Sequence, residues 1–209
     1  MGFPVVGVPA TIDNDVNGTE IAIGVDTALN TILDAVDRIK DTASSHQRAF
    51  LIETMGRDSG YLALVGGLAG GAELSLIPEA KTALEDVAEA IKAAYVRGKA
   101  HCIIMVAEGW KPGTRKLVDY LSGRREELGF GIRPTVLGYI QRGGAPSAFD
   151  RVLATRLGAA AAEALARGER GIMVGWERSR ALSTPLEQAV AFQKEVNLEL
   201  CELAEVMEL

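Results

Sequence analysis

Hydrophobic residues along the chain follow two alternating patterns, short continuous runs and longer stretches with helical spacing. A short continuous run is typical of a strand that is buried on both faces. A stretch in which apolar residues recur every three or four positions indicates a helix with one buried face. The predicted strands are Pro4–Val8, Ala49–Met55, Leu74–Ile77, Cys102–Ala107, Thr135–Ile140 and Gly171–Trp176. The predicted helices are Val25–Lys40, Leu62–Gly71, Ala83–Arg97, Lys116–Leu128, Phe149–Ala166 and Pro185–Met207.

The regular alternation of strands and helices predicts the fold class. Strands that are apolar throughout, separated by helices, are expected in parallel sheets whose two faces are both covered. Right-handed crossovers then restrict the topology. We therefore predict an α/β fold that is doubly wound, with mostly parallel sheets and helices on both faces. The pattern contains no internal repeat, linker or low-complexity tract, and it marks no domain boundary.

Composition narrows the classes of function. The 209 residues are 48% hydrophobic and 24% charged, which is ordinary for a folded domain and excludes a disordered tail or a coiled coil. Lys and Arg total 22 against 28 Asp and Glu, a net charge of −6. So acidic a chain is a poor general binder of nucleic acid, and an anionic ligand would need local basic residues.

Cysteine usage and hydropathy point to a location inside the cell. Cys102 and Cys201 are far apart, so they form neither a disulfide framework nor a zinc pattern. The longest tight apolar run, Cys102–Ala107, is far shorter than a membrane span, and the first residues lack the features of a secretory signal. We expect a cytoplasmic protein with no nucleic-acid or membrane partner.

Polar residues that could carry chemistry directly follow the predicted strands. Ligands of parallel sheets bind beyond the carboxyl ends of the strands, so these residues are expected along one edge of one sheet. They are Asp13, Asp15, Arg57, Glu108, Tyr139 and Arg142. Two neighbouring carboxylates suit Mg²⁺ and a general base, and arginines suit the oxygens of a phosphate. The combination indicates phosphoryl transfer, although each residue alone could equally form a turn or end a strand.

Other residues fit this picture less directly. Arg48 and Arg133 come immediately before predicted strands and so lie at the opposite edge of the sheet. Either they are structural or they serve a site that another subunit completes. His46 and His101 are isolated and are expected to be structural. The chain contains no G-x-x-x-x-G-K-[ST] sequence and no G-x-G-x-x-G sequence after a strand. The sequence therefore shows no recognisable glycine-rich loop for the phosphates of a nucleotide.

Five segments, in this order and spacing, resemble the ATP-dependent 6-phosphofructokinases. They are Thr11-Ile12-Asp13-Asn14-Asp15, Ser45-His46-Gln47-Arg48, Met55-Gly56-Arg57, Glu108-Gly109 and Gln141-Arg142-Gly143-Gly144. The resemblance covers essentially the whole chain but only the C-terminal two-thirds of the family's length. The upstream loops that hold the ATP phosphates in that family have no counterpart, so we expect the chain to be a fragment.

The resemblance implies transfer of a phosphoryl group from ATP to fructose 6-phosphate, with Mg²⁺, to give fructose 1,6-bisphosphate. By this resemblance Asp13 is the base for the sugar 1-hydroxyl, Asp15 a magnesium-associated carboxylate, and Thr11 a contact of the transferring group. Arg57, with Met55 and Gly56 beside it, stabilises the transition state. Glu108 accepts hydrogen bonds from sugar hydroxyls. The 6-phosphate is bound by Arg142, by Tyr139, and by Arg48 and Arg133 of a neighbouring subunit.

The resemblance also carries expectations about donor, regulation and assembly. Tyr139 stands where many members have His, and a tyrosine can donate a hydrogen bond but carries no positive charge. Ala10 stands where pyrophosphate-dependent relatives usually have Lys, which favours ATP. An effector site for ADP or phosphoenolpyruvate and a homotetramer are implied as well. The effector residues by this resemblance are Lys40, Glu73, Arg97 and Lys99, although basic residues near helix ends are also favoured for structural reasons.

Family architecture suggests a division into lobes and leaves several alternatives open. Residues 1–24 resemble the end of a nucleotide-binding lobe, 25–141 a sugar-phosphate lobe, and 142–209 a return to the nucleotide lobe followed by the last helix, with the nucleotide lobe incomplete. The alternatives are a module that binds sugar phosphate without catalysis, a pyrophosphate-dependent phosphofructokinase, and an unrelated magnesium-dependent enzyme acting on sugar phosphates.

Overall fold

The computed structural model describes residues 3–201 and 203, and the chain divides into two compact units. Unit 1 consists of residues 1–28 and 144–195, and unit 2 consists of residues 29–143 and 196–209. Each unit has its own sheet and its own packed interior, so each is described by itself. In the part of the chain that the structure describes, no helix is both long and apolar enough to cross a membrane.

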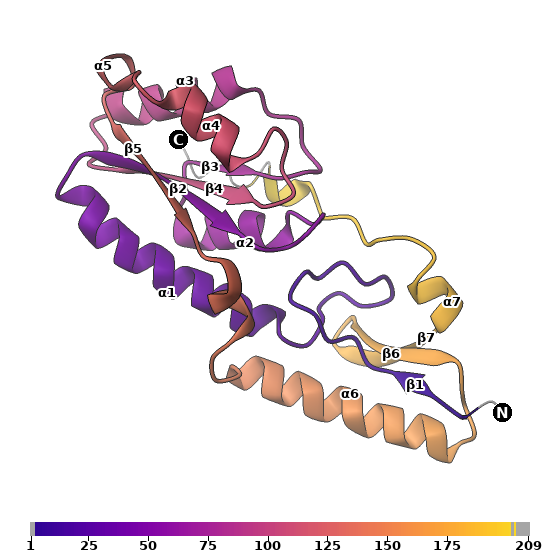
Figure 1. Cartoon of the computed structure of the whole chain (residues 1–209). Helices are drawn as coiled ribbons and strands as arrows, with labels where there is room; N and C mark the ends of the chain where they lie inside the picture. The colour runs from indigo at the N-terminus through magenta and orange to yellow at the C-terminus, as the bar shows by residue number, and fades with distance from the viewer. Residues whose placement is uncertain (1–2, 202, 204–209) are drawn as a thin grey trace. The chain divides into compact units, whose positions relative to one another are not determined.

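Unit 2 contains a four-stranded, fully parallel sheet in the order β3-β4-β2-β5 (Figure 1). The strands are β2 (Arg48–Thr54), β3 (Leu74–Leu76), β4 (Cys102–Ala107) and β5 (Gly131–Val136). The helices are α1 (Val25–Ser44), whose first turn belongs to unit 1, α2 (Tyr61–Gly70), α3 (Leu84–Val96), α4 (Thr114–Leu121) and α5 (Arg125–Leu128). This arrangement confirms the predicted α/β fold.

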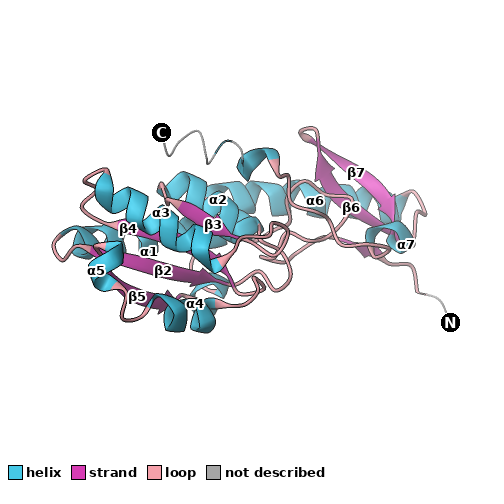
Figure 2. Ribbon diagram, turned by 90° about the horizontal axis from the view of Figure 1, so that it is seen from above, coloured by secondary structure: helices cyan, strands magenta, loops and turns pink. Residues whose placement is uncertain are grey.

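Helices cover both faces of this sheet (Figure 2). All six residues of β4 are buried, which explains why the strand is apolar throughout. Its alternate residues Cys102, Ile104 and Val106 pack into one hydrophobic cluster with residues of α3, α4 and α5. Met105 faces the other way, toward Gly67 of α2. The doubly wound prediction is therefore correct for unit 2.

Glycines let α2 approach its neighbours closely. A Cβ at Gly66 would lie 3.0 Å from Cγ2 of Ile32, and one at Gly70 would lie 3.1 Å from Cγ1 of Val36, both on α1. On the sheet side, a Cβ at Gly67 would overlap the Oγ of Ser75. The hydroxyl of Ser75 is held in this position, because it donates a hydrogen bond to the carbonyl of Ala63.

Replacing Gly67 with alanine should therefore destabilise unit 2, although alanine is the better helix former. We expect a loss of about 1–3 kcal/mol from overpacking, against a helix-propensity gain of about 1 kcal/mol. Urea unfolding measures the net change. The matched control is Gly158→Ala in a helix of unit 1, where a Cβ meets no heavy atom within 4 Å. That control should be stabilised, and equal effects at the two positions would contradict the packing argument.

Unit 1 contains a three-stranded sheet in the order β1-β6-β7. The strands are β1 (Val6–Gly7), β6 (Ile172–Glu177) and β7 (Arg180–Pro185), and the helices are α6 (Ala148–Ala166) and α7 (Leu186–Ala189). β1 and β6 are parallel, whereas β6 and β7 form an antiparallel hairpin. Helix α6 packs on this sheet, with Leu153 and Leu157 buried against Val174.

The hairpin strand β7 was not predicted from the sequence. Its two-residue turn consists of Arg178 and Ser179, both with positive φ (48° and 64°). Such turns usually carry Asn-Gly or Asp-Gly, whose backbone adopts positive φ easily. Arg-Ser gives no such signal, and no element was predicted between Trp176 and Pro185.

Two predicted elements in unit 2 have different bounds. The predicted strand Thr135–Ile140 is wrong: β5 ends at Val136, and residues Gly138–Arg142 form the 3₁₀ helix η1. Gly138 has a φ of +56°, which turns the chain out of the extended conformation. Arg133 consequently lies within β5 and not before it. The predicted helix over 116–128 is divided into α4 and α5 by Gly123, whose φ is +82°.

The predicted last helix, over 185–207, is wrong over residues 190–198, whereas Leu186–Ala189 and residues 199–201 and 203 are helical. Pro185 ends β7, α7 ends at Ala189, and Gln193 forms an isolated antiparallel bridge with Val16. The backbone N–H of Lys194 donates a hydrogen bond to the carbonyl of Asp15, 2.9 Å away, in place of a helical bond. Residues 202 and 204–207 of this prediction lie outside the described residues.

β5 forms an edge of the sheet in unit 2, and no strand of the described chain pairs with its outer side. The N–H groups of Gly131 and Leu137 donate to carbonyls of the β2 side, namely those of Gln47 and Glu53. Because N–H directions alternate along a strand, the nitrogen of Pro134 faces outward. Proline is compatible with this position, since no ladder hydrogen bond is lost.

Candidate functional site

The loop that follows β1 in unit 1 carries Thr11, Asp13 and Asp15. The hydroxyl of Thr11 accepts a hydrogen bond from the backbone N–H of Asp13 at 3.2 Å. Asn14 adopts a left-handed conformation (φ 53°), which asparagine tolerates better than most residues. Its buried side chain donates to the carbonyl of Glu20 (3.2 Å) and accepts from the N–H of Ala22 (3.1 Å). The loop is thereby fixed, and Asp13 within it is only 8% exposed.

A second segment of unit 1 holds the loop at Asp15. The side-chain amide of Gln193 donates to Oδ2 of Asp15 at 3.2 Å, and the backbone N–H of Lys194 donates to its carbonyl. The ammonium of Lys194 donates to the carbonyls of Thr19 (3.0 Å) and Glu20 (2.9 Å). Sequence reasoning missed this segment, because it was assigned to a solvated helix and contains no motif.

Burial lowers the pKa of Lys194 to about 8, from an ordinary value of about 10.5, although the nearby carboxylates of Asp15 and Glu20 act in the opposite direction. The folded state therefore binds fewer protons than the unfolded state between these two pKa values. It follows that the unfolding free energy contributed by this group rises as the pH increases from about 8 to about 10.5.

This rise can be isolated with a Lys194→Met variant, which lacks the titrating group. The unfolding free energy of the wild type minus that of the variant should increase by about 1 kcal/mol between about pH 7 and about pH 10.5, a value reduced because solvent reaches part of the side chain. Urea unfolding of both proteins across this range measures the difference. A difference that stays constant with pH would show that the pKa of Lys194 is not lowered by folding.

Asp15 is the candidate ligand for Mg²⁺, and Asp13, two residues before it, is the candidate general base. Among the described residues, no group of three or more His, Cys, Asp or Glu side chains could hold a metal ion. Mg²⁺, however, commonly binds through one or two carboxylates, with water and substrate phosphate oxygens completing its shell. The donor set therefore fits Mg²⁺ that is bound together with a phosphorylated substrate.

In unit 2, hydrogen bonds join the segments that follow three different strands. Oε1 of Glu108, after β4, accepts from the N–H groups of Gly56 (3.1 Å) and Arg57 (2.7 Å), after β2. Oε1 of Gln141, in η1 after β5, accepts from the N–H of Met55 at 2.9 Å. The Met55–Gly56–Arg57 loop is thus held on both sides. Arg57 has a φ of 55°, an uncommon value for a non-glycine residue.

Gln141 was not singled out from the sequence as a site residue, although it lies in a motif that was recognised. It is only 1% exposed, and its Nε2 has no hydrogen-bond partner among the described residues. Its position in the recognised Gln-Arg-Gly-Gly segment was the available signal in the sequence. The segment after β4 also approaches the Met55–Gly56–Arg57 loop closely at Gly109, where a Cβ would overlap the carbonyl oxygen of Arg57.

Tyr139 and Arg142 both lie in η1, and the guanidinium of Arg142 lies 5.6 Å from the centre of the Tyr139 ring. Tyr139 is 79% exposed.

The sequence predicted that six candidate residues would follow strands of one sheet, and this prediction is wrong. The six are Asp13, Asp15, Arg57, Glu108, Tyr139 and Arg142. β1 belongs to the separate sheet of unit 1, so only the residues of unit 2 follow strands of the four-stranded sheet.

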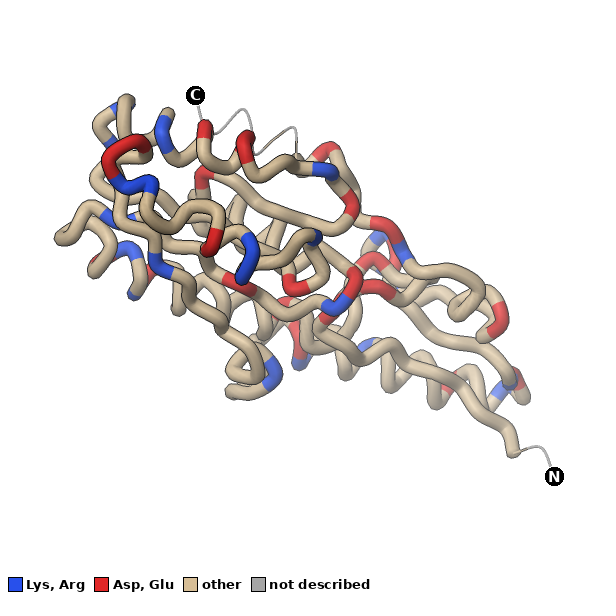
Figure 3. The backbone as a smooth tube through the Cα atoms, turned by 45° about the horizontal axis from the view of Figure 1, so that its top comes forward, with Lys and Arg blue, Asp and Glu red and all other residues tan. Residues whose placement is uncertain are grey.

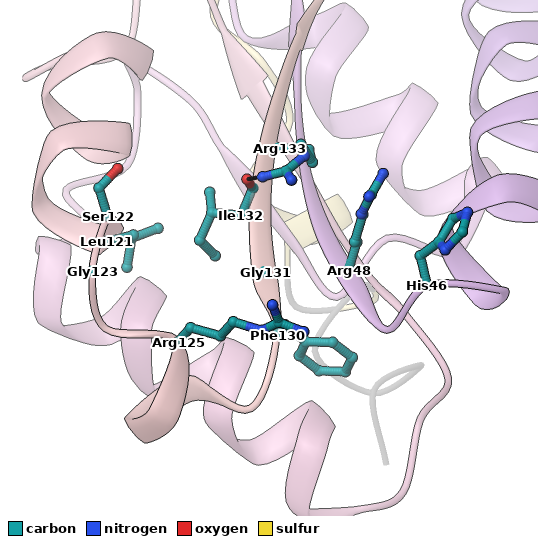
Figure 4. A pocket seen from close by; sticks show the side chains of 10 residues that line it. All are labelled: His46, Arg48, Leu121, Ser122, Gly123, Arg125, Phe130, Gly131, Ile132 and Arg133. Atoms are coloured by element: carbon teal, nitrogen blue, oxygen red, sulfur yellow. Dashed lines mark hydrogen bonds between the residues drawn. The ribbon is translucent and has the colours of Figure 1, made fainter.

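Arg48 and Arg133 lie together at one hollow in unit 2, as Figure 4 shows. The hollow has a volume of about 400 Å³. His46 also lines it, together with Arg125, which sequence reasoning missed because an arginine within the predicted helix Lys116–Leu128 belongs to no motif. The two arginines that the sequence left as either structural or functional are therefore neighbours.

The candidate effector residues are only partly brought together. Glu73 is 4% exposed and accepts hydrogen bonds from the ammonium of Lys99, 3.2 Å away, and from the N–H of Ile103. Lys40 Nζ lies 3.5 Å from the position a Cβ would take at the neighbouring Gly71. Arg97 ends α3, where its N–H donates to the carbonyl of Ala93. Glu73 thus has a clear structural role in holding the start of β4.

The chain is similar to known proteins along its whole length. A family model described as phosphofructokinase matches residues 1–165. The ATP-dependent 6-phosphofructokinase 1 of Thermus thermophilus is 52% identical over 208 residues, which cover 100% of this chain and 64% of that protein. The ATP-dependent 6-phosphofructokinase of Natranaerobius thermophilus is 49% identical over 205 residues, covering 98% and 63%. The chain thus spans less than two thirds of the length of these relatives.

Solved structures agree with this similarity. The phosphofructokinase of Saccharomyces cerevisiae matches with a TM-score of 0.81 and 31% identity, covering 99% of this chain and 27% of that chain. The pyrophosphate-dependent phosphofructokinase of Marinobacter aquaeolei matches with a TM-score of 0.78 and 26% identity, covering 94% and 55%. The fold is therefore shared with these proteins.

Proposed function

Because the chain belongs to the phosphofructokinase family, we propose that it transfers a phosphoryl group from ATP to the 1-hydroxyl of fructose 6-phosphate and yields fructose 1,6-bisphosphate, a cytoplasmic step of glycolysis. Relatives named as ATP-dependent are 49–52% identical to the chain, whereas the pyrophosphate-dependent neighbour is 26% identical. Ala10, a small residue before Thr11, is compatible with a nucleotide donor.

The observation that carries the proposal is the way in which the Met55–Gly56–Arg57 loop is held. Glu108 and Gln141 bind its three backbone N–H groups, so the position and the uncommon conformation of Arg57 are set before any substrate binds. Phosphoryl transfer depends mainly on positioning and on fixed positive charge near the transferring group. A preorganised arginine is suited to stabilise that charge, and the second carboxylate oxygen of Glu108 is suited to accept a sugar hydroxyl.

The loop of unit 1 supplies the proposed acid–base chemistry. Asp13 accepts the proton of the sugar 1-hydroxyl, and the hydroxyl of Thr11, which already accepts the N–H of Asp13, contacts the transferring group. Asp15 is the proposed ligand of Mg²⁺, which when bound neutralises charge on the phosphoryl oxygens. The bonds from Gln193 and Lys194 fix the orientation of Asp15 and the backbone around it.

Binding of the 6-phosphate and assembly complete the proposal. Arg142 and Tyr139 bind the 6-phosphate, and Arg48 and Arg133 of a neighbouring copy contribute to it in a homotetramer. Tyr139 supplies a hydrogen bond without charge, so the 6-phosphate is bound with one cation fewer than if this residue were a protonated histidine.

An effector, ADP or phosphoenolpyruvate, is proposed to bind at Lys40, Glu73, Arg97 and Lys99. The side chain of Lys99 is already paired with Glu73.

Coupled turnover of fructose 6-phosphate by the purified 209-residue chain tests the proposal, with MgATP and pyrophosphate compared as donors. Turnover that requires MgATP would show that the chain transfers the phosphoryl group without the upstream loops that hold ATP in the resembled family. Faster turnover with pyrophosphate would overturn the choice of donor. A chain that is folded by circular dichroism and binds fructose 6-phosphate without turnover would reduce the function to sugar-phosphate binding.

A further inference from the structure

The 3₁₀ helix η1 buries its residues in the reverse of the usual order. Its apolar residue Ile140 is 58% exposed, whereas Gln141 is buried. In folded proteins isoleucine is among the most buried residue types, and glutamine is mostly exposed. Hydrophobic packing therefore does not explain the inward position of Gln141. The hydrogen bond that its side chain forms does.

That hydrogen bond extends the connection between β2 and β5 beyond the end of the sheet. The backbone N–H of Leu137 still donates to the carbonyl of Glu53 at 3.0 Å. After this bond β2 continues into the Met55–Gly56–Arg57 loop, and β5 is followed by η1. Oε1 of Gln141 accepts from the N–H of Met55 at 2.9 Å, so a side chain joins the two segments after the strands have ended.

The amide of Gln141 acts through its oxygen. Its Nε2 has no hydrogen-bond partner among the described residues. A glutamate at this position keeps an oxygen that accepts from the N–H of Met55, and burial favours its neutral form. A methionine has a similar length and fills the same space, but its sulfur is only a weak acceptor. These two replacements therefore separate the hydrogen bond from the packing.

The two segments joined by this bond carry residues with proposed roles at opposite ends of the substrate. Arg57, two residues after Met55, is proposed to stabilise charge on the transferring group. Arg142 directly follows Gln141, and its guanidinium lies 5.6 Å from the centre of the Tyr139 ring. Arg142 and Tyr139 are the proposed ligands of the 6-phosphate. Both segments belong to unit 2.

We propose that Gln141 is a positioning residue that fixes the span between the 6-phosphate ligands of η1 and the Met55–Gly56–Arg57 loop. The proposal rests on the proposed function for the roles of the two segments, and it deepens that function by stating what keeps them in register. Binding energy gained at a remote phosphate raises the rate only if it places the reacting atoms correctly, and a misplacement of about 1 Å can cost about a hundredfold. Because Gln141 is only 1% exposed, it acts through Met55 and not by touching the substrate.

Backbone amide NMR of the isotope-labelled chain tests the proposal without requiring turnover, with inorganic phosphate as the probe. Acidic and basic positions are interspersed along the backbone (Figure 3) and the net charge is −6, so phosphate should bind at local arginines and not over a broad face. We expect the resonances of Gly143, which directly follows η1, and of Met55 to shift with the same saturation concentration. In Gln141→Met the resonance of Gly143 should still shift and that of Met55 should not. Gln141→Glu should restore both responses.

Steady-state kinetics with fructose 6-phosphate and MgATP provide a second readout. Gln141→Met should lower kcat by about ten- to a hundredfold and change the KM for fructose 6-phosphate by less than about twofold, since the proposed phosphate ligands remain. Gln141→Glu should restore most of the lost rate. The matched control is Gln188→Met, which replaces an exposed glutamine of α7 in unit 1 and should leave both the NMR response and the kinetics unchanged.

The outcomes separate this proposal from the proposed function. A wild-type chain in which phosphate shifts Gly143 but not Met55, or a Gln141→Met chain in which both still shift, would overturn the positioning role and leave the proposed phosphate ligands intact. If phosphate shifted neither resonance in the wild type, the assignment of the 6-phosphate to η1 would be wrong, and the positioning role would be lost with it. A chain without turnover that shows the expected NMR responses would retain the positioning role and remove only the catalytic proposal.

Discussion

Replacing Asp13 with asparagine should lower the turnover of fructose 6-phosphate with MgATP by about a thousandfold, the contribution expected of a general base. Asparagine has nearly the same shape as aspartate but does not accept a proton from the sugar hydroxyl. The backbone N–H of residue 13 still donates to the hydroxyl of Thr11, and the bonds of Asn14 across the loop are untouched. The loss should therefore appear in kcat, with the KM for fructose 6-phosphate changed little.

Steady-state kinetics of the Asp13→Asn chain beside the wild type provide the measurement. The matched control is Asp34→Asn on α1, an exposed carboxylate that pairs with Arg38 at 3.0 Å and has no proposed role. That variant should keep full activity. If Asp13→Asn retained more than about a tenth of the wild-type rate, the loss would be much smaller than the loss expected when a general base is removed. Asp13 would then have to be given another role.

Replacing Asp150 with alanine should cost about 3 kcal/mol of the stability of unit 1. The carboxylate is only 2% exposed and accepts hydrogen bonds from the N–H groups of Gly24 and Thr27, both at 2.8 Å, and from the hydroxyl of Thr27. These N–H groups are at the start of α1, where amides lack helical partners and where a negative charge is favourable. Alanine would leave them buried without an acceptor.

Hydrogen exchange of the β6 amides measures the opening free energy of unit 1 by itself. Asp150→Asn keeps one acceptor oxygen and should lose about half as much stability as Asp150→Ala. Ser147→Ala removes only the hydroxyl that accepts the N–H of Asp150 at the start of α6, and it should cost about 1 kcal/mol. Equal losses in all three variants would indicate that capping of α6, and not the carboxylate, determines the stability.

The sequence was sufficient for elements whose signals are local. α3 and α6 were predicted to within one residue at each end, because their apolar spacing is regular and Ser147 is a good N-cap before α6. β4 was predicted with its actual bounds, since a strand covered on both faces is apolar throughout. The α/β class and the family followed from the same patterns and from the order of the motifs.

Other features depend on contacts between distant residues, which no local pattern contains. The helix predicted through Gln193 and Lys194 is replaced by bonds to Asp15, 178 residues away from Gln193 along the chain. Gly138 and Gly123 redirect the backbone where hydrophobic spacing alone predicted a continuing strand and a continuing helix. For the candidate site, the motifs identified most residues, but the bonds from Glu108 and Gln141 to one loop became visible only in the fold.

The outward-facing nitrogen of Pro134 has a consequence for how the sheet of unit 2 meets other molecules. An exposed edge strand with free N–H groups is a template on which another extended chain can add and start aggregation. Pro134 removes the donor at the middle of the outer side of β5, so strand addition there is interrupted. Another copy that approaches this edge would therefore have to dock through side chains, which opposes growth of a continuous sheet.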